Sequence, residues 1–111
     1  MLLGLLQESC VALNKGEATI DSSTARQLEE VITGWQISND NLSISKNFKF
    51  KNYYETISFV NSVAWIANQQ DHHPDLMVSY NQCNITYSTH SVGGLSRNDF
   101  ICAARINQLF A

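Results

Sequence analysis

Basic residues are scarce and scattered in this chain. Seven Lys and Arg stand against ten Asp and Glu in 111 residues, and the formal net charge is −3. Binding to the phosphate backbone of nucleic acids needs clustered Lys and Arg side chains. The sequence therefore predicts a protein with no nucleic-acid partner.

Long apolar runs are missing as well. The apolar stretch Met1–Leu6 is short, follows no basic region and is soon interrupted by Glu8. A membrane-spanning helix needs about 20 apolar residues, and a secretory signal places a basic region before its apolar core. We expect no membrane partner and no signal peptide. Residues 1–20 are expected to form an N-terminal extension, docked on the protein or loosely ordered.

Closely spaced cysteine pairs are a third absence. Cys10, Cys83 and Cys102 are odd in number, and no two of them stand at the CxxC spacing. This pattern is typical of reduced thiols in a cytoplasmic protein. A glycine-rich phosphate loop and a Ser/His/Asp arrangement of known sequence type are also lacking.

Apolar residues, in contrast, are plentiful enough for a core. They make up 44% of the chain, while charged residues make up 15%. This composition predicts one folded domain, which we place at residues 21–111. Its periodicity predicts helices at about 23–33, 52–69 and 97–109, and strands at about 35–38, 42–50, 76–80 and 83–90.

These elements predict the fold class. Two β-hairpins separated by a helix favour an α+β fold in the order α-β-β-α-β-β-α, with a four-stranded antiparallel sheet and helices packed on one face. Gly34 is expected to stop the first helix. Ser96 and Asp99 have the spacing of a capping box at the start of the last one.

The helix at 52–69 carries more apolar surface than one core face requires. One stripe contains Phe59, Val63 and Ile66, and a second contains Ile57, Val60, Ala64 and Ala67. A helix that packs on a single core needs an apolar arc of about 100°. The surplus fits packing against another subunit as well, or a helix sunk deep in its own core.

The three histidines form the candidate site. His72 and His73 precede the strand at 76–80, and His90 lies at the end of the strand at 83–90. Since a hairpin brings position 90 back towards 73, the imidazoles can meet at one end of the sheet, where they could exchange protons near neutral pH. The alternatives are structural histidines and a zinc site, although adjacent side chains such as His72 and His73 tend to diverge. Asp99 could cap its helix and still face the site.

At this point the sequence resembles the pterin-4a-carbinolamine dehydratase family, some animal members of which are also dimerization cofactors of a homeodomain transcription factor. The resemblance covers about residues 21–110. The matching residues are Gly34-Trp35, Phe48-Lys49-Phe50-Lys51, Asp71-His72-His73-Pro74-Asp75, Tyr80, Ser88-Thr89-His90, Gly94-Leu95 and Asp99. The combination is specific, whereas His-His-Pro alone would not be.

The resemblance implies an enzyme that dehydrates 4a-hydroxytetrahydropterin to quinonoid dihydropterin in tetrahydropterin recycling, without a metal or other cofactor. The implied partners are the pterin substrate, further copies of the chain in a homodimer or homotetramer, and a functional link to an aromatic amino acid hydroxylase. Two alternatives stay open. One is an inactive pterin- or protein-binding paralogue that acts as a dimerization cofactor, and the other is a small metal-binding protein.

The resemblance also implies roles for individual residues. His72 and His90 are the expected acid/base residues, and His73 is expected to bind the substrate. The other residues expected at the pocket are Asp71, Ser88, Thr89 and Ser91, with Asp99, Asn68 and Trp35 as supporting residues.

Position 68 departs from the family pattern. The family prefers an ionisable residue there, commonly Glu, but this chain has Asn68. A carboxylate beside an imidazole favours its charged form, which a neutral amide does not. Asn68 is therefore expected to lower the protonated fraction of His72 if it faces the site, or simply to end its helix at the surface.

Overall fold

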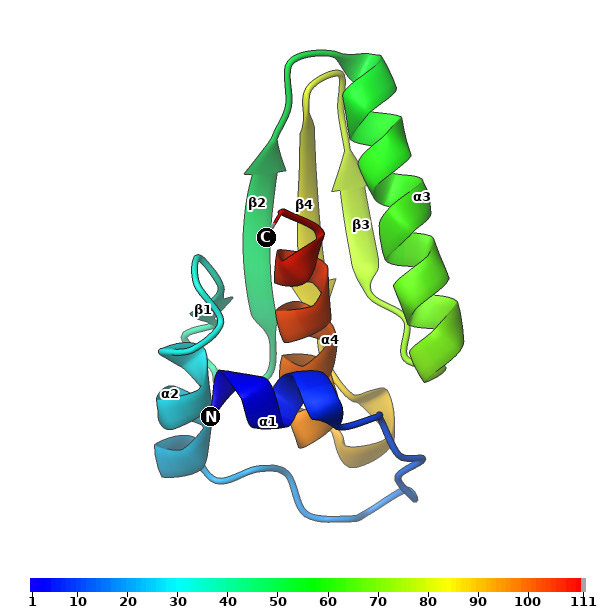
Figure 1. Ribbon diagram of the computed structural model, residues 1–111. Helices are drawn as coiled ribbons and strands as arrows, with labels where there is room; N and C mark the ends of the chain where they lie inside the picture. The colour runs from blue at the N-terminus through cyan, green and yellow to red at the C-terminus, as the bar shows by residue number, and fades with distance from the viewer. Residues whose placement is uncertain (111) are drawn as a thin grey trace.

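The computed structural model describes residues 1–110 (Figure 1). In chain order its elements are α1 (Leu2–Gln7), α2 (Ser22–Glu29), β1 (Gln36–Ile37), β2 (Ile44–Lys49), α3 (Tyr53–Gln70), β3 (Asp75–Val78), β4 (Gln82–Tyr87) and α4 (Arg97–Asn107), with short 3-10 helices at His90–Val92 and Gln108–Phe110. None of the helices within these residues combines the length and apolar character needed to cross a bilayer.

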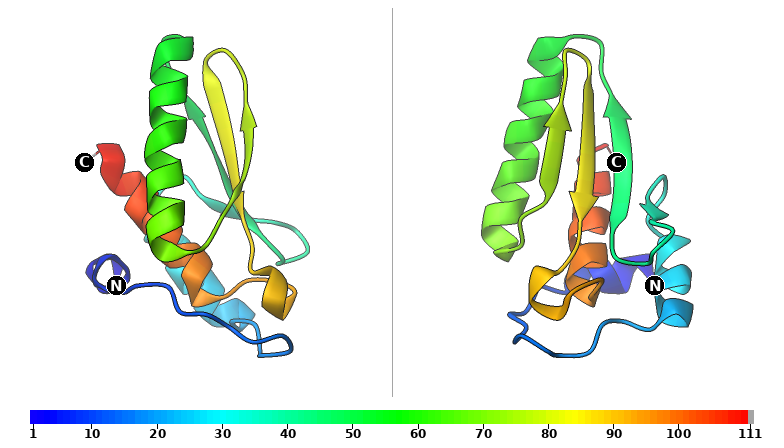
Figure 2. Two further views of the ribbon diagram at one scale, coloured as in Figure 1. Left: turned by 90° about the vertical axis from the view of Figure 1, so that its right-hand side faces the viewer. Right: turned by 180° about the vertical axis from the view of Figure 1, so that it is seen from behind.

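Within residues 1–110, four strands form one antiparallel sheet in the order β1-β2-β4-β3. The helices α3 and α4 lie on one face of this sheet, and the opposite face carries no helix from the described residues (Figure 2). The predicted α+β class, with its four-stranded antiparallel sheet and helices on one face, is confirmed.

The core lies between the sheet and these helices. Ile44 and Phe48 of β2 and Ile85 and Tyr87 of β4 are buried, while the residues between them are more exposed. This is the period-two alternation expected of a sheet with one covered face. The helical side of the core includes Phe59, Val63, Phe100, Ala103, Ala104 and Ile106.

The predicted helix at 23–33 is too long. The side chain of Asp21 accepts a hydrogen bond from the Thr24 N–H and caps α2, but the helix ends at Glu29. Residues 30–34 continue as turns, consistent with the low helix propensity of the β-branched run Val31-Ile32-Thr33. Gly34 closes these turns with a φ of 86°, and a Cβ atom there would lie 2.7 Å from the Lys46 side chain.

The strand expected at 83–90 is also too long, and its correction changes the position of His90. β4 ends at Tyr87, and the exposed His90 instead begins a 3-10 helix. Gly93 ends this turn with a φ of 71°. The preceding strand, expected at 76–80, ends at Val78, so Tyr80 lies in the hairpin turn.

The N-terminal residues are docked and contain a helix that the sequence did not predict. Leu5 of α1 is fully buried and belongs to the core. Residues 8–20, here called the N-terminal strap, then cross the beginning of α4. Both carboxylate oxygens of Glu8 accept hydrogen bonds from Arg97, and the Asn98 side chain bonds the N–H and C=O of Val11. The strap thus rests on α4 and the loop before it.

The two apolar stripes of α3 have different surroundings. Phe59, Val63 and Ile66 are buried against the core, whereas Ala64 is exposed. Ile57 and Val60 are half-buried and Ala67 is buried, while Trp65 on the same helix is 67% exposed. The second stripe is therefore buried only in part by its own chain, which fits packing against another subunit.

Candidate active site

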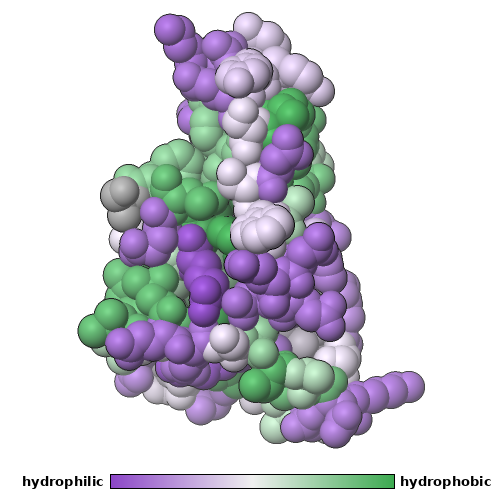
Figure 3. Space-filling model, turned by 45° about the vertical axis from the view of Figure 1, so that its right-hand side comes forward, coloured by the Kyte–Doolittle hydropathy of each residue, from purple (hydrophilic) through white to green (hydrophobic). Residues whose placement is uncertain are grey.

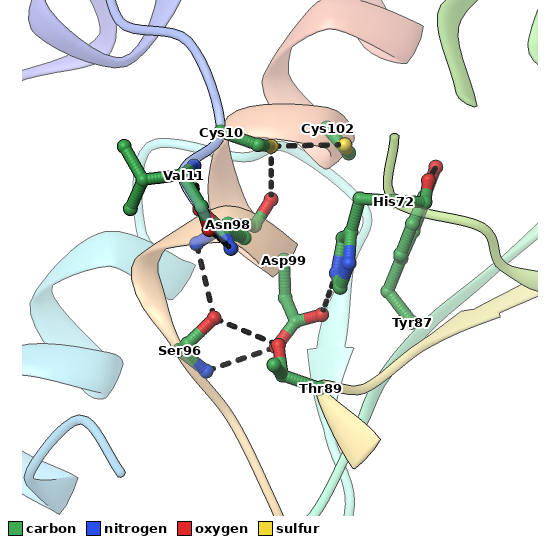
Figure 4. A network of polar contacts seen from close by, with 9 residues as sticks. All are labelled: Cys10, Val11, His72, Tyr87, Thr89, Ser96, Asn98, Asp99 and Cys102. Carbon is green, nitrogen blue, oxygen red and sulfur yellow. Dashed lines mark hydrogen bonds and ion pairs between the residues drawn. The ribbon is translucent and has the colours of Figure 1, made fainter. Parts of the chain in front are cut away.

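His72 is positioned by the end of α3. Asp71 takes the left-handed conformation, with φ 49° and ψ 44°, and its N–H bonds the carbonyls of Ala67 and Asn68. The next residue is also bonded to the end of α3: the His72 N–H donates to the Ala67 carbonyl over 3.1 Å. The chain turn thus directs the His72 side chain back towards α4 (Figure 4).

Asp99 is the hydrogen-bond partner of His72. The His72 Nε2 atom lies 2.6 Å from Asp99 Oδ1, and the carboxylate is completely buried. The other oxygen, Oδ2, accepts hydrogen bonds of 2.9 Å from the Thr89 hydroxyl and from the Ser96 N–H. The predicted capping box is confirmed, and its carboxylate also holds the histidine, as Figure 4 shows.

This network determines the tautomer of His72. An ionised carboxylate only accepts hydrogen bonds, so His72 Nε2 carries a proton directed at Asp99. In the neutral ring, Nδ1 is then the nitrogen free to accept a proton. His72 is thus held in a defined orientation, with one nitrogen available for proton exchange.

Tyr87 supports the opposite side of the His72 ring. The two rings stack at a centroid distance of 5.1 Å, and the Tyr87 hydroxyl donates to the His72 carbonyl. Burial raises the pKa of the Tyr87 phenol, so the hydroxyl stays protonated. Trp35 packs against Tyr87 from within the core and donates its indole N–H to Asn107. Trp35 therefore lies one layer behind the histidine.

The other predicted site residues lie around the same end of the β3–β4 hairpin. Asp75 pairs with Thr86, so the antiparallel register places His73 and Ser88 just beyond the paired strands. His73, His90, Asp71 and Ser91 are exposed, and Ser88 is half-buried. The structure thus joins His72, Thr89 and Asp99 by hydrogen bonds, while the other expected pocket residues are exposed or, for Ser88, half-buried.

Sequence reasoning missed two members of this network as site residues. Ser96 is predicted only as a helix cap, and Tyr87 falls within the strand predicted at 83–90. The Ser96 hydroxyl lies 2.7 Å from that of Thr89, which is itself 5% exposed. The period-two pattern of β4 predicts that Tyr87 faces the core, but stacking on His72 depends on how the loop after α3 folds back.

Surface shape alone does not identify the site. A hollow of about 490 Å³ between β2 and the end of α4 is lined by residues such as Lys46, Phe48 and Asn107, and by none of the histidines. Among residues 1–110, His, Cys, Asp and Glu side chains form no group of three or more that could hold a metal ion. We therefore place the site by its hydrogen-bonded chemistry.

Comparison with known proteins identifies the family. The family model described as pterin 4 alpha carbinolamine dehydratase matches residues 18–109. The chain belongs to this family. The assignment to a dehydratase family, a class of hydro-lyases, is thereby confirmed, and the match spans every residue of the His72 network described above.

Relatives agree with this assignment. A protein from Nitrosomonas eutropha is 54% identical over 87% of this chain and 79% of its own length. Another, from Nitrosomonas europaea, is 44% identical over 96% of this chain and 93% of its own length. Both are provisionally named pterin-4-alpha-carbinolamine dehydratases.

A solved structure supports the fold. The crystal structure of a transcriptional coactivator/pterin dehydratase from Brucella melitensis has a TM-score of 0.79 and 28% sequence identity. The structural match covers 84% of this chain and 99% of the Brucella chain. The dehydratase fold is therefore shared over most of both molecules.

Proposed function

We propose that this protein dehydrates 4a-hydroxytetrahydropterin to quinonoid dihydropterin in tetrahydropterin recycling. The observation that carries the proposal is the His72–Asp99 pair, a partly exposed imidazole with 12% side-chain exposure on a fully buried carboxylate. Such a pair holds a proton donor in a fixed orientation. Family membership supplies the substrate class, a pterin.

The reaction needs an acid and a base. The departing 4a-hydroxyl takes up one proton and leaves as water, while the ring N5 loses one proton, so the net loss is one water molecule. His72 and His90 are the proposed acid/base residues, and His73 is the proposed binding residue. Asp71, Ser88, Thr89 and Ser91 complete the proposed pocket, with Thr89 also holding Asp99 in place.

The first test concerns metal-free catalysis. Purified protein should accelerate dehydration of the carbinolamine equally well in the presence and absence of a chelator, because imidazoles alone can move both protons. The measurement is the rate of quinonoid dihydropterin formation after exhaustive dialysis against the chelator. Activity that disappears with the chelator and returns with zinc would show that a metal carries out the step.

An inactive paralogue is the second candidate, and Asn68 is the observation that favours it. A pterin-binding module would bind a tetrahydropterin without accelerating the dehydration. Equilibrium binding measured beside turnover on one preparation separates the two functions. The intact His72–Asp99 pair supports the active enzyme.

Position 68 gives a finer test. Asn68 is exposed near the C-terminus of α3. Asn68→Glu is expected to favour the protonated form of His72 and to move the alkaline limb of the pH–rate profile upward by a fraction of a pH unit, since water and salt screen an exposed charge. Gln69→Glu is the matched control, because residue 69 is exposed on another side of the same helical turn. Identical shifts in both variants would leave Asn68 without a specific role.

We further propose a homo-oligomer, a dimer or a tetramer, formed by a second copy on the outward surface of α3. Tyr54 is 80% exposed and Trp65 67%, and a groove beside α3 is lined by Phe50, Phe59 and Phe110. Figure 3 shows hydrophobic surface beside the long helix. The edge strand β3 pairs only with β4 in the described chain, so this side also offers unpaired backbone.

Light scattering at micromolar concentration should therefore give a multiple of the 12.5 kDa chain mass. Burying apolar surface stabilises association by about 25 cal/mol per Å². Trp65→Ser should weaken the association, whereas Leu3→Ser on α1, at a residue with 66% exposure, is the matched control. A wild-type monomer would contradict this proposal.

The remaining expectations concern cellular context. We propose that the enzyme acts in the cytoplasm, where thiols are kept reduced, since Cys10, Cys83 and Cys102 are all free in the described structure. Its substrate would be produced by an aromatic amino acid hydroxylase, which supplies the 4a-hydroxylated pterin.

A further inference from the structure

Two of the three cysteines meet beside the candidate site, although they lie 92 positions apart in the sequence. The sulfur atoms of Cys10 and Cys102 are 3.6 Å apart. Cys10 belongs to the N-terminal strap and Cys102 to α4, and Figure 4 shows the pair above the His72–Asp99 network. Neither thiol has a role in the proposed dehydration.

The surroundings hold the two sulfur atoms in contact. The Cys10 N–H donates to the Gln70 side chain, and its thiol donates to the Asn98 carbonyl. Asn98 in turn fixes the next strap residue, Val11, through two hydrogen bonds. Cys102 is fully buried. The strap is therefore fastened to the first turn of α4 on both sides of the sulfur contact.

The two thiols differ in reactivity. The hydrogen bond with the Cys102 thiol lowers the pKa of Cys10, which is half-buried. The same contact, with burial, raises the pKa of Cys102. The thiolate is the reactive form of cysteine. Cys10 is therefore the thiol that reacts first with a small oxidant, and Cys102 is positioned to react with the product.

We propose that Cys10 and Cys102 form a reversible redox site, in which a peroxide-class oxidant links them by a disulfide that fastens the strap to α4. The Cys10 thiolate attacks hydrogen peroxide, which breaks the O–O bond, releases hydroxide and leaves a sulfenic acid on Cys10. The Cys102 sulfur then displaces the hydroxyl, which takes the thiol proton and leaves as water. In total, two thiols are oxidised and one peroxide is reduced to two waters.

The link requires a small movement. A disulfide bond is about 2.05 Å long, so the sulfur atoms must approach each other by roughly 1.5 Å from their present contact. The strap has no regular secondary structure between Glu8 and Asp21, and a short approach of this segment needs no change in the sheet. The bond would close a loop from residue 10 to residue 102, which restricts the unfolded chain.

Peptide mapping tests the proposal directly, because trypsin places each cysteine on a separate peptide. Cleavage after Lys and Arg yields residues 1–15 with Cys10, 52–97 with Cys83 and 98–105 with Cys102. Native protein is treated with hydrogen peroxide, quenched in acid, alkylated in denaturant and digested. We expect residues 1–15 joined to 98–105, with the mass of two hydrogens lost, and separation of the two peptides by dithiothreitol.

Cys83→Ala is the matched control, since Cys83 is a buried thiol of β4 that is free in the described part of the chain, and its replacement should leave the link intact. Cys10→Ala should abolish it. For the wild-type protein, oxidation should also raise the thermal unfolding midpoint by about 5 °C or more, reversibly. A sulfinic acid on Cys10 without a link, a link to Cys83, or three unreacted thiols would overturn the proposal.

Discussion

Asp99→Asn is expected to slow dehydration by about a hundredfold or more. The amide keeps the shape of the carboxylate but not its charge, so it cannot accept all the hydrogen bonds that Asp99 accepts. It must also present an N–H₂ group either to the His72 Nε2 proton or to the donors of Thr89 and Ser96. One of these contacts becomes a buried mismatch, which costs about 1–3 kcal/mol of stability.

The pH–rate profile distinguishes this role from helix capping. If the Asp99 carboxylate acts on the reacting imidazole, replacing it should change the pH dependence of turnover as well as its rate. Glu55 offers a matched control, because it occupies the third position of α3, behind the Asn52 cap, as Asp99 does behind Ser96 in α4. Glu55→Gln should leave turnover and its pH profile unchanged. An Asp99→Asn enzyme with a normal rate and profile would show that Asp99 is only a helix cap.

His90→Ala is expected to slow turnover by roughly a hundredfold while the protein stays folded. His90 is exposed at the start of a 3-10 helix, and exposed substitutions usually change stability within about 0.5 kcal/mol. The measurements are kcat and the unfolding midpoint in denaturant. The large loss of rate follows from removing one of two proton-transfer groups.

The matched comparison is His73→Ala, which changes another exposed histidine. Its proposed role is binding, so it should raise KM more than it lowers kcat. A His90→Ala protein that unfolds would mean that the residue is structural, and full activity would mean that it is idle. Equal effects on kcat in both variants would remove the distinction between acid/base and binding histidines.

The sequence predicts the sheet and its covered face well. Apolar residues at every second position, such as Ile85 and Tyr87, indicate by themselves which face of a strand is buried. It predicts the ends of elements poorly. The strand before His90 ends three residues early, because Thr89 instead pairs with Gly94 across a turn at Gly93. The alternation of apolar and polar residues contains no signal for this turn. The helix α1 escaped prediction because its stability comes from packing Leu5 into the core, rather than from its own six residues.

In the candidate site, too, local patterns predict some features, while others depend on packing between distant segments. The capping box of Ser96 and Asp99 follows from spacing and is confirmed, whereas the meeting of His72, His73 and His90 at one end of the hairpin stays a prediction. That the same carboxylate bonds His72 depends on how α4 packs against the end of α3, which no local pattern encodes. The Cys10–Cys102 contact likewise arises only when the strap crosses α4.

A direct dehydratase assay tests the central claim. Purified full-length protein is mixed with freshly generated 4a-hydroxytetrahydropterin, and quinonoid dihydropterin is followed by absorbance against buffer alone and against the His72→Ala variant. We expect formation well above the buffer rate for the wild-type protein and a loss of roughly a hundredfold or more for the variant. A wild-type rate equal to that of buffer, in protein that still binds the pterin, would contradict the account and leave a binding module.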